Sequence, residues 1–176
     1  VQSAGSTLFM GVLSAVQVLL HRYTGQDDIT VGSPLAGRDH ADLAGQLGFY
    51  VNTVALRGRV SGDMDFLSVL GEARRVTLEA QEHQGYPFDS LVEELDLERD
   101  MSRSALFDVM VVLQNNDGVD LTDAASGTGL GISAVDTAEG GASKFDLIFI
   151  GTETAVGLDL EIEYNSDLYE HSSIER

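Results

Sequence analysis

The sequence predicts an α/β (α+β) fold in which helices pack on a mixed β-sheet. Apolar residues make up 43% of the 176 residues, which is enough to fill a hydrophobic core. Apolar residues recur at helical spacing in two long stretches and at strand spacing, or in short continuous runs, in several others. Because these helices and strands do not alternate regularly, a mixed sheet is expected rather than a wholly parallel one.

The first helix is expected over residues 7–23, with Ser6 as its N-cap and Gly25 as its stop. An apolar face wider than that of a surface helix predicts that it is covered on most sides, and that isolated copies of the chain self-associate. This face consists of two adjacent stripes, Leu8-Val12-Ala15-Leu19 and Phe9-Leu13-Val16-Leu20.

Two strands and two helices follow the first helix. β-Branched residues predict a strand over 28–35 that runs into a loop, and a second strand is expected over 47–56. A long amphipathic helix is expected over 66–83. Gly85 and Pro87 stop this helix, and a short helix is expected directly afterwards, over residues 88–95.

The rest of the chain is expected to be mostly sheet. Residues 106–113 form an apolar run that predicts a strand buried on both faces, and residues 144–150 are similar. Strict alternation over 156–165 predicts a half-buried strand with one acidic, solvent-exposed face. Residues 115–142 are interpreted as a long loop of the kind that is functional or disordered, with a short strand around 132–135.

The acidic composition restricts the partners. The formal net charge is −19, and a surface this acidic repels phosphate backbones and anionic lipids, so no nucleic acid and no membrane is expected as a partner. The charge is interpreted as a source of solubility, with steering of a basic partner as the alternative. The absence of cysteine is compatible with the cytoplasmic location that we expect, and the first apolar run lacks the pattern of a secretory signal.

Motifs for self-sufficient chemistry are absent from the sequence. There is no GxxxxGK[ST] phosphate-binding loop, no GxSxG nucleophile elbow and no HExxH metal motif. His21 and His83 each close a predicted helix, where the negative end of the helix dipole favours them, and we interpret both as structural. Neither a metal site nor a directly bound cofactor is expected.

Four collinear segments resemble core motifs of the condensation domains of nonribosomal peptide synthetases. Together with fitting segments at 144–147 and 164–169, they extend the resemblance over nearly the whole chain. The family's catalytic signature HHxxxDG is absent, and no two histidines are adjacent. The four segments are 31–38 (VGSPLAGR, similar to GxPxxGR), 47–57 (LGFYVNTVALR, GxFVNTLxLR), 83–92 (HQGYPFDSLV, HQDxPFExLV) and 99–110 (RDMSRSALFDVM, RDxSRxPLFQVM).

The resemblance implies that residues 1–176 are the C-terminal lobe of a two-lobed fold similar to chloramphenicol acetyltransferase. In the family the N-terminal lobe, an expected partner, carries HHxxxDG. The two lobes form peptide bonds between aminoacyl or peptidyl thioesters on the phosphopantetheine arms of donor and acceptor peptidyl carrier proteins, in the biosynthesis of antibiotics. The arms are thus expected as substrates, and the isolated chain is expected to be inactive.

Asn52 and Ser33 are the candidates for lining the substrate channel. The resemblance implies that Asn52 faces the channel, where its amide can donate to an oxyanion or orient a substrate. An equally supported interpretation is that this amide bonds the backbone of a neighbouring loop.

Other motif residues are expected to be structural. Arg38 is interpreted as part of a buried ion pair in preference to a substrate contact, and Asp100 and Arg103 are interpreted likewise. Gly37 permits close approach of another backbone. The remaining structural candidates are Pro34, His83, Pro87 and Phe88.

Two alternatives in function stay open. One is a non-catalytic condensation-like module that recruits tailoring enzymes, with which the acidic charge and the Gly-rich loop are compatible. The other is a heterocyclisation-type relative, whose diagnostic DxxxxD belongs to the other lobe. An epimerisation domain is disfavoured because its C-terminal Gly/Tyr-rich pattern is missing.

Overall fold

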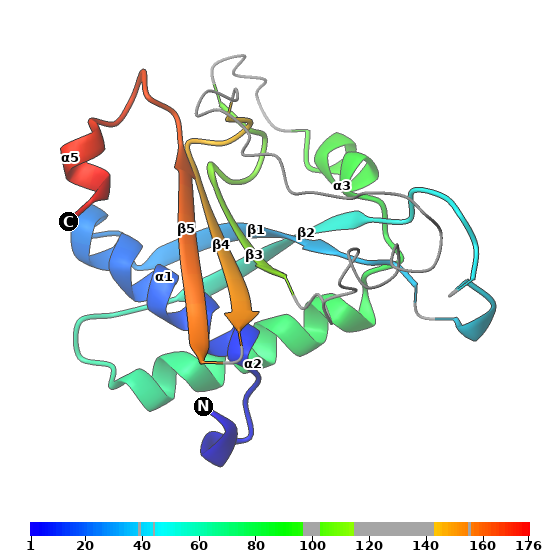
Figure 1. Cartoon of the computed structure of the whole chain (residues 1–176), viewed down its shortest axis with the longest axis horizontal. Coiled ribbons are helices and arrows are strands. Elements are labelled where there is room, and N and C mark those ends of the chain that lie inside the picture. Colours follow the sequence, from blue (N-terminus) through cyan, green and yellow to red (C-terminus); the bar gives the residue numbers. More distant parts are fainter. Residues whose placement is uncertain (39, 44, 97–102, 115–142, 155) are drawn as a thin grey trace, which may run out of the picture.

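A five-stranded mixed sheet is the centre of the fold (Figure 1). The computed structural model describes residues 1–38, 40–43, 45–96, 103–114, 143–154 and 156–176. Within these ranges the strand order is β2-β1-β3-β4-β5. β1–β3 and β3–β4 are parallel pairs, while β1–β2 and β4–β5 are antiparallel, which confirms the predicted fold class. The strands are β1 (Asp28–Leu35), β2 (Asn52–Arg59), β3 (Val109–Gln114), β4 (Leu147–Thr154) and β5 (Gly157–Tyr164).

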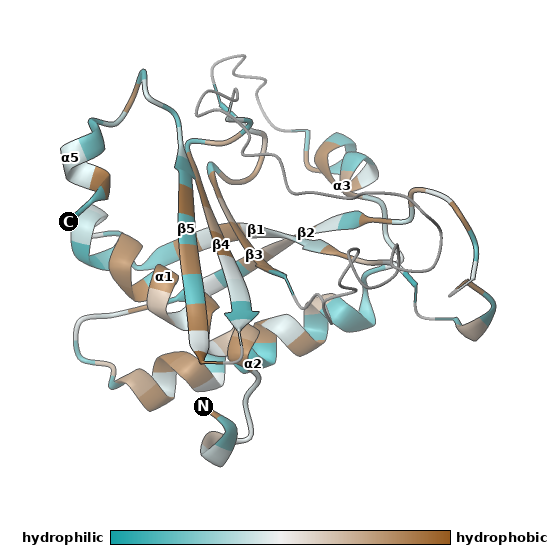
Figure 2. Ribbon diagram, in the orientation of Figure 1, coloured by the Kyte–Doolittle hydropathy of each residue, from teal (hydrophilic) through white to brown (hydrophobic). Residues whose placement is uncertain are grey.

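Two long helices, α1 (Leu8–Thr24) and α2 (Phe66–Glu82), pack against each other and against one face of the sheet. Figure 2 shows hydrophobic residues on both helices and along the strands. The buried core joins α1 and α2 to every strand except β5, whose Ile162 packs on it from the margin. The shorter elements are η1 (Gln2–Ala4), η2 (Ala41–Leu43), α3 (Phe88–Glu94) and α5 (His171–Ile174).

The N-cap of the first helix differs from its prediction. It is Thr7 and not Ser6, because the Thr7 hydroxyl accepts from the backbone N–H of Met10 at 3.3 Å. The helix is covered on most sides over residues 10–17, where only Ala15 is exposed, and it is more open toward its end, where Leu19 is exposed. Gly25 ends it as predicted, in the left-handed conformation with φ of 70°.

Strand boundaries shift where apolar runs continue into loops. β2 begins at Asn52, so the predicted strand residues 47–51 belong to a loop. β3 and β4 each begin three residues later than predicted, at Val109 and Leu147. Burial of β3 on both faces is also wrong, because only Val111 is fully buried and its strand neighbours are half-buried or exposed.

The half-buried prediction for β5 is wrong over its first half. Leu158 and Leu160, on its apolar side, are 38% and 53% exposed, and the strand lies at the edge of the sheet. The predicted loop over 115–142 and its short strand lie outside the described residues. Among the described residues, no helix is both long enough and apolar enough to cross a membrane.

Candidate functional site

Asn52, the first residue of β2, bonds four backbone groups with its side chain. Its Nδ2 donates to the carbonyls of Gln84 at 2.7 Å and Tyr86 at 2.8 Å. Its Oδ1 accepts from the N–H groups of Thr53 at 3.0 Å and Phe88 at 3.3 Å. The amide nitrogen has only two hydrogens, and both are engaged by these carbonyls. This geometry fits the interpretation that the Asn52 amide bonds the backbone of a neighbouring loop.

The turn that Asn52 holds connects α2 to α3. His83 caps the C-terminus of α2, where its N–H donates to the Glu79 carbonyl at 3.2 Å, and Tyr86 N–H donates back to the His83 carbonyl at 3.0 Å. Helix α2 ends at Glu82, before Gly85 and Pro87, which are the residues predicted to stop it. Pro87 is the N-cap of the next helix, α3. A hydrogen bond to Glu94, followed by burial, raises the pKa of the Tyr86 hydroxyl.

Gly37 brings a second backbone segment to the same place. Its φ is +61°, a left-handed conformation that glycine adopts without strain. A Cβ at this position would lie 2.1 Å from the carbonyl oxygen of Tyr50, so the expected close backbone approach is present. This contact places Gly37 against the backbone of Tyr50, two residues before β2 begins at Asn52.

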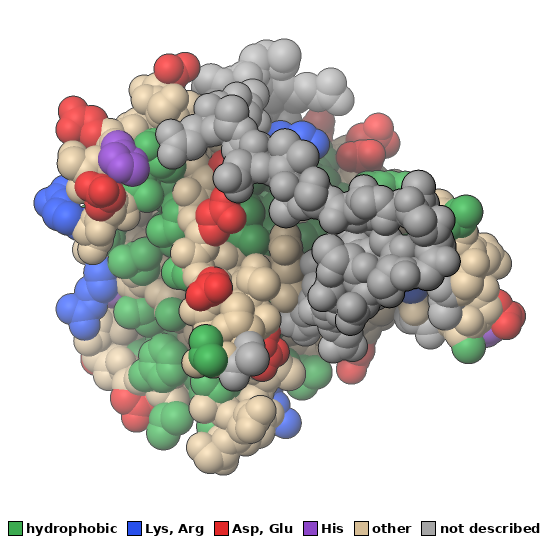
Figure 3. Space-filling view, viewed as in Figure 1, with side chains coloured by type: hydrophobic (Ala, Val, Ile, Leu, Met, Phe, Trp, Pro, Cys, Tyr) green, Lys and Arg blue, Asp and Glu red, His purple; other side chains and the backbone are tan. Residues whose placement is uncertain are grey.

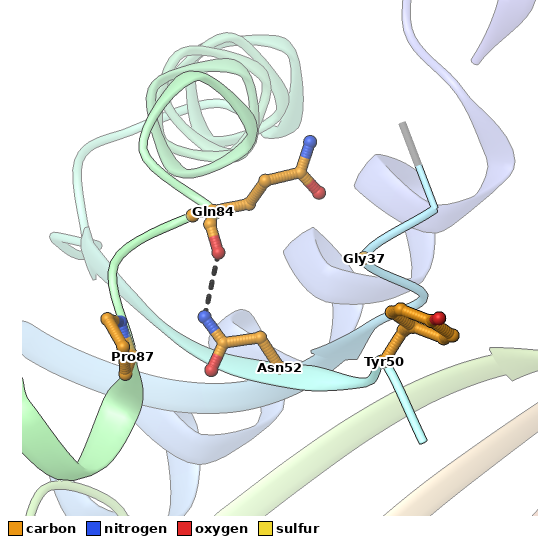
Figure 4. A pocket seen from close by; sticks show the side chains of 6 residues that line it. Gly37, Tyr50, Asn52, Gln84 and Pro87 are labelled. Carbon is orange, nitrogen blue, oxygen red and sulfur yellow. Dashed lines mark hydrogen bonds between the residues drawn. The ribbon is translucent and has the colours of Figure 1, made fainter. Parts of the chain in front are cut away.

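These segments enclose a pocket of about 250 Å³, here called the Asn52 pocket (Figure 4). In Figure 4 the side chain of Asn52 points toward the carbonyl of Gln84, while Tyr50 lies beside Gly37. The lining comes from three of the four segments that carry the family resemblance, although these lie far apart in the sequence. The lining residues are Gly37, Tyr50, Asn52, Gln84, Gly85 and Pro87.

Arg38 does not form the predicted buried ion pair among the described residues. Its exposed guanidinium donates to the carbonyls of Leu43, Gln46 at 2.8 Å and Gly48 at 3.1 Å. It also lies over the ring of Tyr50, 4.5 Å from the centroid. The planar fork therefore fixes a loop through backbone oxygens instead of a carboxylate.

Aromatic rings connect the remaining segment to this site. The ring of Phe107 is buried and lies 5.6 Å from that of Phe88 and 5.4 Å from that of Phe145, centroid to centroid. A Cβ at Gly32 would lie 2.1 Å from the Phe107 ring, so the ring packs directly on the β1 backbone. Thus all four segments meet around β1 and β2.

The other predicted site residues lie outside the pocket lining. Ser33 is 2% exposed within β1, and its neighbour Pro34 pairs with Thr53 of β2. Arg103 forms an ion pair with Asp108 of its own segment, but its guanidinium is exposed and not buried as predicted. Asp100 lies outside the described residues.

Carboxylates gather where β3 and β4 begin. The backbone N–H of Asp146 donates to the Asp108 carbonyl at 2.9 Å. Burial, and then the nearby Asp108 carboxylate, raise the pKa of Asp146. Burial and the same two carboxylates raise the pKa of Tyr169. This cluster joins the start of the parallel strands to the segment after β5, and none of its residues lines the pocket.

Sequence reasoning missed three lining residues, namely Tyr50, Gln84 and Gly85. Each lies within a segment that resembles a family motif, which is the only signal that points to it. Gln84 lines the pocket and contributes to the Asn52 contact through its backbone carbonyl, a group that every residue type carries.

Known proteins resemble this chain over its whole length. Residues 1–176 match the family model of the condensation domain. The chain is 47% identical over 172 residues to bacitracin synthase 3 of Bacillus licheniformis, covering 98% of this chain and 3% of that protein. It is 45% identical over 175 residues to tyrocidine synthase 3 of Brevibacillus parabrevis, covering 99% of this chain and 3% of that protein.

Solved structures share the fold. The X-domain from teicoplanin biosynthesis superposes with a TM-score of 0.82 at 26% identity, covering 98% of this chain and 39% of that chain. The first condensation domain of the CDA synthetase superposes with a TM-score of 0.73 at 23% identity, covering 99% of this chain and 37% of that chain. With its full-length family match and its close curated relatives, the chain belongs to the condensation domain family.

Proposed function

We propose that this chain is the C-terminal lobe of a condensation domain that forms peptide bonds in a nonribosomal peptide synthetase. In this proposal the Asn52 pocket is part of the wall of the substrate channel. The observation that carries the proposal is the convergence of three distant motif segments on one pocket. Packing alone explains buried apolar positions in such segments, but it does not explain why polar and glycine residues from all three border one cavity.

The reaction needs an amine held close to a thioester carbonyl. The amine nitrogen attacks the carbonyl carbon, the C–N bond forms, and the C–S bond breaks with the thiol leaving on the donor phosphopantetheine. The proton lost by the amine ends on that thiol. Positioning of the two reactants accounts for much of such an acceleration. Since both donor hydrogens of Asn52 are engaged by carbonyls, Asn52 acts here as a positioning residue that fixes the pocket wall.

The proton-handling groups belong elsewhere in this proposal. His83 is outside the pocket lining, and the sequence has no adjacent histidines. The proposed base is the histidine pair of an N-terminal lobe, and the proposed substrates are the phosphopantetheine arms of donor and acceptor carrier proteins in the cytoplasm. The chain spans only 3% of the length of bacitracin synthase 3 and of tyrocidine synthase 3, which leaves ample sequence in such proteins for these partners.

A non-catalytic module is the second candidate. The X-domain superposes as well as the four-domain nonribosomal peptide synthetase AB3403 does, with a TM-score of 0.82 for each. A similar X-domain structure is a complex with OxyB from teicoplanin biosynthesis, a partner relation that favours recruitment of a tailoring enzyme. A heterocyclisation-type relative also remains an alternative. The sequence upstream of Val1 distinguishes these functions by the presence of HHxxxDG or DxxxxD.

A single-turnover assay with loaded donor and acceptor carriers tests the proposed function. The complete condensation domain is expected to form the peptide bond, while the 176-residue chain alone forms none above the rate in buffer. Peptide-bond formation by the chain alone would contradict the proposal. A complete domain that binds carriers without forming a bond would favour the recruiting module.

A further inference from the structure

Two glycines line the Asn52 pocket, and the backbone requires only one of them. Gly37 has a left-handed φ of +61° and lies against the Tyr50 carbonyl, so a side chain is excluded there. Gly85 has no positive φ, and a Cβ at this position would meet no atom within 4 Å. Neither conformation nor packing requires a glycine at residue 85, so its effect is to leave this part of the pocket wall open.

Gly85 also departs from the family pattern. Its segment HQGYPFDSLV is similar to HQDxPFExLV, in which an aspartate stands at the position of Gly85. An aspartate there would add both volume and a negative charge beside the pocket. Without it, none of the six lining residues carries a charge. The pocket differs in this respect from the rest of the surface, because the formal net charge is −19 and Figure 3 shows Asp and Glu side chains on several parts of one face.

The pocket lining offers ring surfaces and few free polar groups. In Figure 4 the rings of Tyr50 and Pro87 lie at opposite ends of the pocket, with Asn52 between them. The Asn52 side chain is engaged by backbone groups, and the Tyr50 hydroxyl donates to Oε1 of Gln46 at 2.7 Å. Within the described part of the chain, the Gln84 amide is the one polar side-chain group of the lining without a hydrogen bond. Such a lining suits an apolar ring, which packs on other rings and needs no hydrogen-bond partner.

We infer that the Asn52 pocket takes the aromatic side chain of an aminoacyl substrate and that Gly85 admits it, an inference that rests on the proposed function. The pocket volume of about 250 Å³ is below the range of about 300 to 1,000 Å³ for pockets that hold drug-sized ligands, and it fits a single side chain. A charged side chain would lose its hydration here without an opposite charge in the lining. A small side chain would forgo the contacts with the two rings.

Single-turnover peptide-bond formation by the complete condensation domain tests this selectivity. Phenylalanine or alanine is loaded first on the donor carrier, with a glycine acceptor, and then on the acceptor carrier, with a glycine donor. The measured quantity is the ratio of the rate with phenylalanine to the rate with alanine. The variants are Gly85→Asn and Gly85→Asp, whose new side chains have nearly the same shape and differ in charge. Gly62→Asn is the matched control, because Gly62 also has no positive φ and nothing within 4 Å, but follows the opposite end of β2.

We expect Gly85→Asn and Gly85→Asp each to lower this ratio by about 10-fold or more at the donor or at the acceptor, because a side chain at residue 85 takes the room of the substrate ring. Gly62→Asn is expected to keep the wild-type ratio. An unchanged ratio for Gly85→Asn at both carriers would overturn the inference. A ratio lowered by Gly85→Asp alone would also overturn it, since charge and not room would then decide the selection.

Binding of N-acetylphenylalaninamide to the 176-residue chain is a second measurement, which needs neither carriers nor turnover. We expect NMR shift changes at the backbone amides of Tyr50, Asn52 and Gln84, with a dissociation constant on the order of 1 mM, and their loss in Gly85→Asn. No such changes in the wild-type chain would overturn the inference. These changes together with an inactive complete domain would defeat the proposed function and leave the aromatic pocket standing. An active complete domain whose ratio does not respond to residue 85 would have the opposite meaning.

Discussion

Two loops border the Asn52 pocket, and a single polar side chain holds each of them through backbone oxygens. Asn52 reaches carbonyls 32 and 34 residues away and ties β2 to the turn after α2. Arg38 reaches carbonyls only 5 to 10 residues away and closes its own loop. The long-range contact fixes a wall against the body of the protein, whereas the local contact shapes a projecting surface. Similar hydrogen bonding thus serves two purposes, which differ in the sequence distance that they span.

Gly37→Ala is expected to have the largest effect, because it disrupts the junction of both loops. The Cβ would meet the Tyr50 carbonyl at 2.1 Å in a left-handed conformation, and we expect a loss of about 3 to 5 kcal/mol in the free energy of unfolding. Gly25→Ala is the matched control. Gly25 has a φ of +70° but nothing within 4 Å, so a loss of only about 1 to 2 kcal/mol is expected.

Urea denaturation of the two variants measures this difference. Equal losses for Gly37→Ala and Gly25→Ala would mean that the loops yield to a side chain at residue 37, and that the close backbone approach is not fixed.

Asn52→Ala is expected to have the next largest effect on stability. It removes four bonds to backbone groups, and at about 0.5 to 1.5 kcal/mol each, partly replaced by water, we expect a loss of about 2 to 4 kcal/mol. Asn165→Ala is the control, because the Asn165 side chain accepts only a local bond from Asp167 N–H. Its loss is expected to be below about 1 kcal/mol. A smaller loss for Asn52→Ala than for this control would remove the distinction between long-range and local contacts.

Arg38→Ala is expected to have the smallest effect on global stability, within about 0.5 kcal/mol, since the side chain is exposed and its contacts are local. Hydrogen exchange is the sensitive measurement. Backbone amides of residues 45–51 are expected to exchange faster in the variant, while those of the turn over 83–88 keep the wild-type rate. Faster exchange in both segments would show that the two loops are one cooperative unit.

Sequence patterns predicted the elements whose periodicity is set by the core. β1 matches its prediction, because β-branched residues point into the core from a strand that neighbours flank on both sides. α2 matches to within one residue, because its apolar stripe packs on β2. The prediction of a strand was wrong over residues 47–51. The alternating Leu47, Phe49 and Val51 resemble the apolar face of a strand, but nothing in the described residues covers them.

The sequence predicted the residues of the site better than it predicted the groups that these residues contact. Gly37 and Asn52 stand out by residue type and resemblance, and both line the pocket. Their partners do not stand out, because carbonyl oxygens of Gln84, Tyr86 and Tyr50 carry no signal in the sequence. The backbone carbonyls that accept from Arg38 carry no such signal either, and a carboxylate was therefore expected as its partner.

Single-turnover peptide-bond formation by the complete condensation domain tests most directly whether the Asn52 pocket is a channel wall. The comparison is between Asn52→Ala and Val111→Ala, a substitution in the buried core that is also expected to cost about 2 to 3 kcal/mol. We expect Asn52→Ala to slow the reaction by about 10- to 1000-fold at a temperature where both variants are folded, and Val111→Ala to change it by less than about twofold. A wild-type rate for Asn52→Ala, or equal slowing in both variants, would contradict the proposed role of the pocket.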